Sequence, residues 1–369
     1  MAKFLKSTKY AQEPDWPIAG VQNYRSNMKE ARERGLAARK LLYTTVFSQC
    51  FSPCGKFLAA ANNFGYIAVF SLEAALAPAA TDISKNPIYT FKASEDGSIN
   101  CLISTDTLII SASYGTISAW KWSDVLSRAS KVLWTLTIPK RQPFFTPEVN
   151  SIYINSQEDM ANHLFAGCGD NNIHVWDIET GQEVHCLQGH TDYVHAITKK
   201  SDNECASASE DGTVRIWDCR SAGEASLILQ PFKHEACARP EFGKWVGCVG
   251  VDSGNDWLIC GGGPRMSAWY LRSLTMSTTF DTPGACQQFI MFNEDTVISA
   301  GTEAFVNHWY MNGDCKSRVP CTPTSVFSVA INRESETNRV LCVAGSSATI
   351  DVCTNFGYKA FGLSFTIPD

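Results

Sequence analysis

Three evenly spaced histidines are the residues of this chain whose types and spacing most readily suggest chemistry. The segment "HCLQGHTDYVHA", residues 185–196, contains His185, His190 and His195, with Asp192 between the last two. Histidine nitrogens bind zinc or act as general bases, and a carboxylate nearby can orient the ring. A zinc site gathers ligands at spacings of about two to five residues and needs a third or fourth donor. The role of these histidines therefore depends on the elements that carry them.

Length and composition describe a globular protein without a membrane span. The chain has 369 residues, of which 44% are hydrophobic and 18% charged, and its net charge of −6 gives no overall attraction to phosphate backbones. The N-terminus lacks the apolar stretch of a secretory signal. The fifteen cysteines are odd in number and lie mostly in apolar runs such as "VGCVGV". We therefore expect an intracellular protein with buried free thiols, no disulfide framework and no structural zinc site.

An internal repeat organises the chain. "HVWDIETG" (174–181) and "RIWDCRSA" (215–222) align with their tryptophans 41 residues apart, within the period of about 40–45 residues typical of a four-stranded propeller blade. Weaker copies bring the number to about seven, and they end at Phe70, Trp120, Trp269, Trp309 and Cys353. Each unit contains a small-residue run such as "CASAS" or "LICGGG", a tight turn, and a strand of alternating polarity.

These units resemble WD40 repeats over residues 46–365. The resemblance implies an all-β fold, a seven-bladed WD40 β-propeller. The residues before it are expected to form a short N-terminal helical arm. We accordingly divide the chain into residues 1–45, a basic and helical arm, and residues 46–369, the propeller. The small-residue runs are expected to be the strands that pack closely against neighbouring blades.

The WD40 resemblance also assigns the central histidine. In that family the histidine of a Gly-His pair, a hydroxyl residue, an aspartate of the tight turn and the blade tryptophan form a buried hydrogen-bonded chain. His190, Ser207, Asp211 and Trp217 stand at those places, and the fourth unit alone keeps the complete set. His190 is thus expected to be structural, and the other two histidines of the segment to lie on different strands. We predict no catalytic residue, no metal site and no cofactor.

Residues 27–43, "NMKEARERGLAARKLLY", depart from the blade pattern and are rich in helix formers. We interpret them as a basic arm with Arg32, Arg34, Arg39 and Lys40 as candidate partner-binding residues; the alternative is a solvated, partly disordered tail. The segment "YKAFGLSF" (358–365) alternates enough to be the outer strand of the last blade, so the ring is expected to close without an N-terminal strand.

The fifth unit carries an insert. Its tryptophan lies 52 residues after Trp217, which makes room for "FKHEACARPEFGKWVGC" at 232–248. We expect an interaction loop with His234, Arg239 and Trp245 as candidate partner contacts. A catalytic role for Cys237 has no activating pattern in the sequence.

Five stretches carry a narrower resemblance, and they are "VFSQCFSPCGKFLAAANNFGYIAVFSL" (46–72), "LQGHTDYVHA" (187–196), "KHEACARPEFGKWVGC" (233–248), "WLICGGGPRMSAWYLRS" (257–273) and "TNFGYKAFGLSF" (354–365). They resemble the WD40 subunit-six family of the THO complex. The resemblance implies a non-enzymatic scaffold in the nucleus that couples transcription and processing of pre-mRNA to mRNA export. Implied partners are the coiled-coil THO subunits five and seven and, indirectly, a DEAD-box RNA helicase and an export adaptor. Direct RNA contact through the arm would be weak and salt-sensitive.

Two other classes of function compete with the scaffold. Trp217, Asp218 and Arg220 match the Trp-Asp-x-Arg pattern of WD40 substrate receptors of cullin-RING ubiquitin ligases, although arginine there is frequent in ordinary blades. An enzyme is disfavoured, because the sequence shows no nucleophile elbow, no phosphate-binding glycine loop followed by lysine, and no metal triad.

Overall fold

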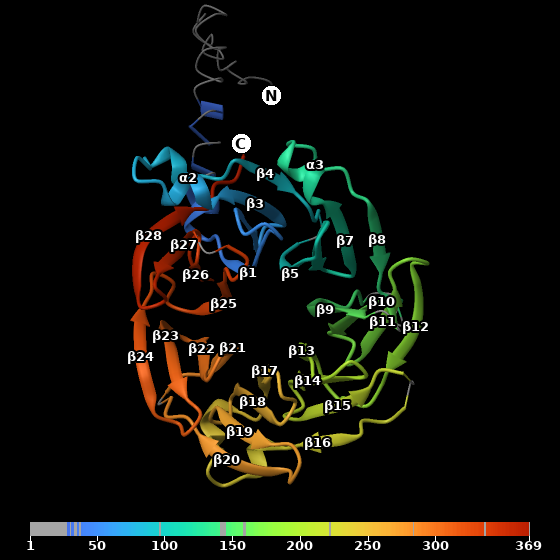
Figure 1. Ribbon diagram of the computed structural model, residues 1–369. Coiled ribbons are helices and arrows are strands. Elements are labelled where there is room, and N and C mark those ends of the chain that lie inside the picture. The colour runs from blue at the N-terminus through green and yellow to red at the C-terminus, as the bar shows by residue number, and fades with distance from the viewer. Residues whose placement is uncertain are drawn as a thin grey trace, which may run out of the picture.

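Seven antiparallel sheets of four strands surround a central channel (Figure 1). The computed structural model describes residues 28–29, 31–32, 35–36, 38–95, 97–140, 145–157, 160–220, 223–282, 284–335 and 337–368. In every sheet the strands follow one another along the chain, from the channel outwards. This confirms the predicted seven-bladed propeller.

The strands of blades one to four are β1 (Val46–Phe51), β2 (Phe57–Asn62), β3 (Tyr66–Ser71), β4 (Tyr89–Lys92); β5 (Ile99–Ser104), β6 (Leu108–Ser113), β7 (Thr116–Lys121), β8 (Trp134–Thr137); β9 (Val149–Gln157), β10 (Met160–Cys168), β11 (Ile173–Asp177), β12 (Gln182–Leu187); and β13 (Val194–Lys199), β14 (Glu204–Ser209), β15 (Val214–Asp218), β16 (Leu227–Leu229). Those of blades five to seven are β17 (Val246–Val251), β18 (Trp257–Gly262), β19 (Ser267–Tyr270), β20 (Thr275–Thr279); β21 (Gln287–Asn293), β22 (Thr296–Gly301), β23 (Glu303–Tyr310), β24 (Cys315–Pro320); and β25 (Val326–Ile331), β26 (Val340–Gly345), β27 (Thr349–Thr354), β28 (Tyr358–Ser364). Short helical turns lie in three connections, and they are α2 (Leu72–Leu76), η1 (Ile83–Lys85), α3 (Trp122–Leu126), η2 (Pro231–Lys233) and η3 (Pro240–Phe242).

The hydrophobic core consists of layers between neighbouring blades. Alternate side chains of a strand point to opposite faces of its sheet. In β2, Leu58 and Ala60 pack against blade seven, whereas Ala59 and Ala61 pack against blade two. All four are fully buried. The second strand of each blade must therefore fit between two sheets, which explains its run of small residues.

The ring closes between blades seven and one without an N-terminal strand, as predicted, because the last four strands, β25–β28, form blade seven. Gln49 Nε2 donates hydrogen bonds across this seam to the carbonyls of Ser328 (3.2 Å) and Cys342 (2.9 Å). Asn332 Nδ2 donates to the carbonyl of Gly55 at 2.7 Å. Hydrogen bonds from buried carboxamide side chains thus connect blades seven and one, which share no strand.

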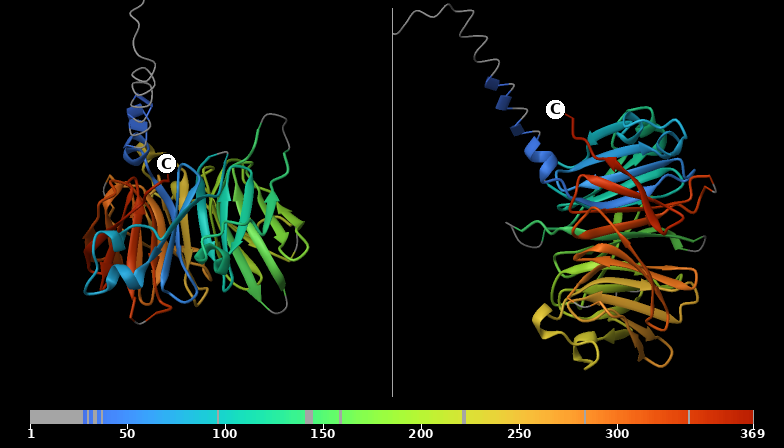
Figure 2. Two further views of the ribbon diagram at one scale, coloured as in Figure 1. Left: turned by 90° about the horizontal axis from the view of Figure 1, so that it is seen from above. Right: turned by 90° about the vertical axis from the view of Figure 1, so that its left-hand side faces the viewer.

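The described residues of the arm at 28–29, 31–32, 35–36 and 38–42 are helical. Figure 2 shows them projecting away from the ring. They expose apolar side chains, including Leu42 (76% exposed) and Tyr43 (67%). The arm is tied to blade one where Asn63 Nδ2 donates to the Tyr43 carbonyl (3.1 Å) and Asn63 Oδ1 accepts from the Thr45 amide (2.9 Å).

All fifteen cysteines are free, and nine of them are buried, which agrees with the expected thiol chemistry. Within the described ranges, no helix has the length and apolar character needed to cross a bilayer.

Candidate functional site

The four residues expected to form a buried chain in blade four lie in hydrogen-bond contact. Asp211 Oδ2 is 2.8 Å from His190 Nδ1, and Ser207 Oγ is 2.8 Å from His190 Nε2. Trp217 Nε1 donates to the same Ser207 oxygen at 2.8 Å. None of the four is more than 7% exposed. Each link thus joins one strand or loop of the blade to another away from bulk solvent.

The partners of His190 define its tautomer. An ionised carboxylate only accepts hydrogen bonds, so Asp211 requires the proton on Nδ1. Nε2 is then free to accept from the Ser207 hydroxyl, whose oxygen accepts from Trp217. Burial lowers the pKa of His190, which keeps the ring neutral. Burial alone would raise the pKa of Asp211, but hydrogen bonds from His190 and Thr213 outweigh it and lower that pKa.

The three histidines of the opening segment do not converge. His185 lies on β12 and His195 on β13, as predicted, while His190 lies in the loop between these strands. His195 Nε2 pairs with Glu210 Oε2 at 2.7 Å. The segment therefore supplies no common metal or catalytic site.

A fourth histidine, His174 on β11, was not among the residues predicted from the sequence to form a site. Its side chain is fully buried between two carboxylates, with Nδ1 2.6 Å from Glu183 Oε1 and Nε2 3.0 Å from Asp170 Oδ2. Burial would lower its pKa, but the hydrogen bonds to Asp170 and Glu183 prevail and raise it. Asp170 lies four residues before His174, a spacing that could have drawn attention to the pair.

A metal site is the alternative interpretation of the cluster around His174, because Cys168, Asp170 and His174 place ligand atoms within 4.8 Å of one another. A metal would have to displace a carboxylate from a ring nitrogen that already has a partner. It would also need the thiolate, yet burial raises the pKa of the Cys168 thiol well above its ordinary value. The arrangement fits a buried ion pair better than a metal centre.

The insert of blade five is fixed by Arg239, which the structure places inside the protein. Arg239 is 7% exposed, and its guanidinium donates to five backbone carbonyls, those of Gly262, Gly263, Pro264, Thr282 and Ala285, at 2.8–3.2 Å. The predicted role of Arg239 as a partner contact is therefore corrected to a structural one. The sequence could not reveal this, because a buried arginine is rare and its acceptors lie on distant loops.

Two other candidates of the insert remain accessible. His234 is exposed and contacts the ring of Trp269, with ring centroids 6.0 Å apart. Trp245 is half-buried, and its Nε1 donates to the Phe242 carbonyl at 2.9 Å. Its carbonyl lies only 2.3 Å from where a Cβ at Gly262 would stand. The glycine run at residues 261–263 thus allows the backbone at Trp245 to approach closely.

The Trp-Asp-x-Arg segment forms a clamp within one turn. Arg220 Nε and Nη2 donate to Asp218 at 2.9 and 2.6 Å, while Trp217 is buried in the hydrogen-bonded chain. The Arg220 side chain is 62% exposed.

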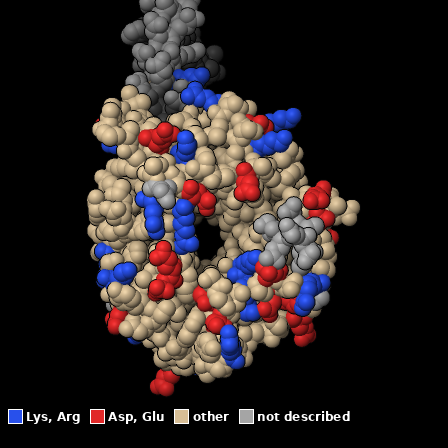
Figure 3. Space-filling view, in the orientation of Figure 1, with Lys and Arg blue, Asp and Glu red and all other residues tan. Residues whose placement is uncertain are grey.

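On the arm, Arg32 and Arg39 are exposed and Lys40 is half-buried. Arg34 lies outside the described residues. Around the channel mouth that faces the viewer in Figure 3, acidic and basic side chains are interspersed. The described residues of this face therefore present no single-sign field of the kind that attracts a phosphate backbone.

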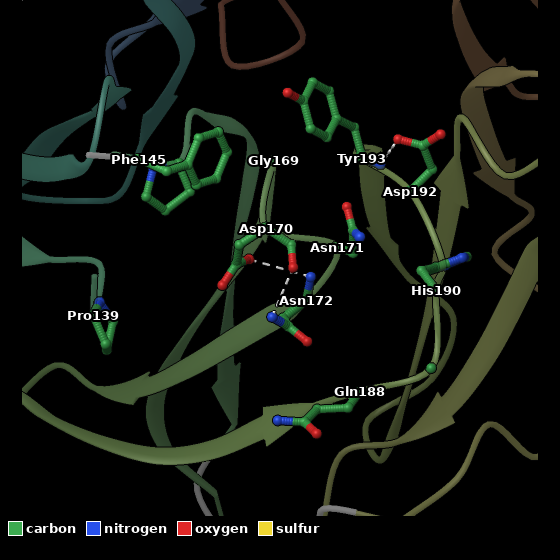
Figure 4. A pocket seen from close by; sticks show the side chains of 12 residues that line it. Pro139, Phe145, Gly169, Asp170, Asn171, Asn172, Gln188, His190, Asp192 and Tyr193 are labelled. Carbon is green, nitrogen blue, oxygen red and sulfur yellow. Dashed lines mark hydrogen bonds between the residues drawn. The ribbon is translucent and has the colours of Figure 1, made fainter. Parts of the chain in front are cut away.

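A pocket of about 520 Å³ lies between blades three and four. It is lined by Pro139, Phe145, Pro147, Gly169, Asp170, Asn171, Asn172, Gln188, Gly189, His190, Asp192 and Tyr193. Figure 4 shows Phe145 and Tyr193 on two sides, with Asp170 between them. Sequence reasoning did not identify this pocket, because its lining comes from three separate loops.

Comparison with known proteins agrees with this architecture. The family described as "WD domain, G-beta repeat" matches residues 181–218. The WD40 β-propeller domain of Doa1 superposes with a TM-score of 0.64 at 16% identity, covering 85% of this chain and 93% of that one, which shows the fold alone.

Longer matches identify the family. The "THO complex subunit 6 homolog" of Danio rerio is 45% identical over 88% of this chain and 99% of its own length. "THO complex subunit 6" of Homo sapiens is 42% identical over 89% of this chain and 95% of its own, and that of Drosophila melanogaster is 30% identical over 86% and 89%. The chain belongs to the THO complex subunit 6 family of WD40 β-propellers.

Proposed function

We propose that this protein is a non-enzymatic scaffold subunit of a THO complex in the nucleus, where it supports the coupling of pre-mRNA transcription and processing to mRNA export. The observation that carries the proposal is the match to named THO complex subunits along nearly their whole length, 99% for the Danio rerio relative. A ring of seven sheets suits such a role, because it presents loops and edges rigidly without a conformational change.

The coiled-coil THO subunits five and seven are the proposed direct partners. The arm offers a suitable contact, since it exposes Leu36 (55%), Leu42 (76%) and Tyr43 (67%) together with Arg32 and Arg39. Exposed apolar side chains accompanied by basic residues fit a helix that presents apolar and acidic residues. The DEAD-box helicase and the export adaptor are proposed to associate indirectly, and RNA to contribute a weak contact at most.

The ligase-receptor hypothesis is the weaker one. Its motif needs Arg220 for an adaptor, but Nε and Nη2 of the guanidinium already donate to Asp218 of the same turn. Recovery of a cullin adaptor that is lost on Arg220→Ala would reverse this ranking.

Affinity purification of the tagged full-length chain from nuclear extract, with and without RNase, tests the scaffold role. Recovery of THO subunits in both samples is the expected result. Loss of all partners with RNase would instead make RNA the primary ligand. Deleting residues 1–40 should leave the melting temperature nearly unchanged, because the ties to Asn63 involve residues 43 and 45, but reduce recovery of subunits five and seven. A large fall in the melting temperature would show instead that the arm is an integral part of the ring.

A further inference from the structure

Two acidic side chains line the pocket between blades three and four. Asp170 lies on its floor and Asp192 on its rim, and among the described residues that line it the sole basic side chain is His190. That ring is neutral and committed to Asp211 and Ser207. Arg215 packs against Gly189, and its Nη2 is 3.9 Å from Asp211.

The floor carboxylate is held in place by hydrogen bonds. The Asp170 side chain is 9% exposed, Oδ2 pairs with His174, and Oδ1 accepts from the Asn172 amide at 3.2 Å. Burial alone would raise its pKa, but these hydrogen bonds lower it below the ordinary value. A carboxylate has about four lone-pair sites, so each oxygen retains capacity for a further donor.

The walls of the pocket are aromatic. Phe145 is half-buried, and Tyr193 is 40% exposed. Asp192 stands beside Tyr193 and accepts its backbone amide at 2.9 Å, an arrangement visible in Figure 4. Aromatic faces attract cations, and a flat guanidinium can both stack on rings and donate paired hydrogen bonds to carboxylates. Lysine fits less well, because its ammonium is compact and strongly hydrated.

We propose that this pocket binds an arginine side chain presented by an extended segment of a partner protein. The volume of about 520 Å³ suits one arginine with parts of its neighbours. Asn171, at the mouth, offers carboxamide groups to the backbone of that segment. The inference rests on the scaffold function, of which it specifies one contact.

The test uses the full-length chain and a fluorescein-labelled peptide, Gly-Ser-Gly-Arg-Gly-Ser-Gly, followed by fluorescence anisotropy. Replacing the arginine by citrulline, which keeps the shape but removes the charge, should weaken binding roughly tenfold, and lysine should fall between the two. Asp192→Asn and Tyr193→Ala should each weaken binding by about threefold or more. Asp192→Asn preserves the acceptor for the Tyr193 amide, so the fold is not at risk.

Tyr358→Ala is the matched control, because Tyr358 is 57% exposed on β28, in blade seven. It should bind like the parent chain. Equal affinity for the arginine and citrulline peptides, or equal loss in the pocket and control variants, would overturn the proposal. If both pocket variants still recover THO subunits while the peptide shows no preference, the arginine site is refuted and the scaffold function stands.

Discussion

Ser207→Ala should be more destabilising than removal of any single surface contact, because one hydroxyl serves two buried partners. Ser207 Oγ donates to His190 Nε2 and accepts from Trp217 Nε1, both at 2.8 Å. Its side chain is fully buried, and those of His190 and Trp217 are nearly so. The substitution leaves one acceptor and one donor unpaired where water has little access.

The expected loss of stability depends on how many buried polar groups lose their hydrogen-bond partner. An unsatisfied buried polar group costs about 1–3 kcal/mol, so two should lower the free energy of unfolding by about 2–6 kcal/mol. Blade six provides the matched comparison. There Trp309 Nε1 donates to Ser299 Oγ at 2.9 Å, and no histidine is part of the contact. Ser299→Ala orphans one group and should cost about 1–3 kcal/mol.

Urea unfolding of the two variants, followed by tryptophan fluorescence, measures the difference. Both midpoints should fall, that of Ser207→Ala about twice as far, with the slope of the transition unchanged. Ser207→Cys should lie in between, because a thiol is a weak donor and acceptor. Equal shifts for Ser207→Ala and Ser299→Ala would refute the claim that the chain is energetically connected through His190.

Three further predictions concern other parts of the ring. The raised pKa of His174 and the lowered pKa of His190 should change stability with pH in opposite directions. The stability due to His174 is complete below pH 6.5 and is lost as pH rises through its raised pKa. His190 becomes destabilising as pH falls below 6.5, because the unfolded state then binds the proton more readily than the folded state. Urea midpoints from pH 5.5 to 8.5 should therefore lose their alkaline decline in His174→Gln and their acid decline in His190→Gln; unchanged profiles would contradict this. Arg239→Met should cost about 3–5 kcal/mol and expose the insert to limited proteolysis, because five carbonyls lose their donor, whereas Arg265→Met, at a 45% exposed side chain, should stay within about 1 kcal/mol. Asn332→Ala should lower the free energy of unfolding by about 2–3 kcal/mol by removing hydrogen bonds to Gly55 and Asn338, and an unchanged urea midpoint would show that the seam does not depend on them.

The sequence predicted those features that repeat and missed those that occur once. The position of Trp176 and Trp217 recurs in each unit, with Phe70 and Cys353 in place of tryptophan in the first and last, and so do the small-residue runs. The ring, its blade number and the strand positions could therefore be predicted. The buried chain around His190 followed from a family pattern. Arg239 belongs to the insert of one blade, and its partners come from loops that only the folded chain brings together. The partners of His174, Asp170 and Glu183, lie only four and nine residues away, so this cluster could have been found from its spacing.

Arg239 shows why a feature that occurs once is difficult to predict from sequence. A charged residue in a loop is normally exposed, which is why Arg239 was expected at the surface. The carbonyls that receive it belong to the glycine run and to the loop after β20, more than 20 residues further along the chain. The repeat pattern of the sequence therefore cannot predict that Arg239 contacts these carbonyls.

The blade that keeps the complete hydrogen-bonded chain is also the one whose loop builds the acidic pocket, and the two features are physically linked. His190 lies between Gly189 and Asp192 on that loop, Thr191 donates its amide to Asp211 at 3.1 Å, and Ser209 Oγ donates to the Asp192 carbonyl at 3.0 Å. The buried chain therefore holds the rim of the pocket in place. Ser207→Ala should accordingly weaken binding of the arginine peptide at a temperature where the variant is still folded, whereas Ser299→Ala should leave that affinity unchanged. Equal affinities in both variants would show that the loop keeps its shape without the chain.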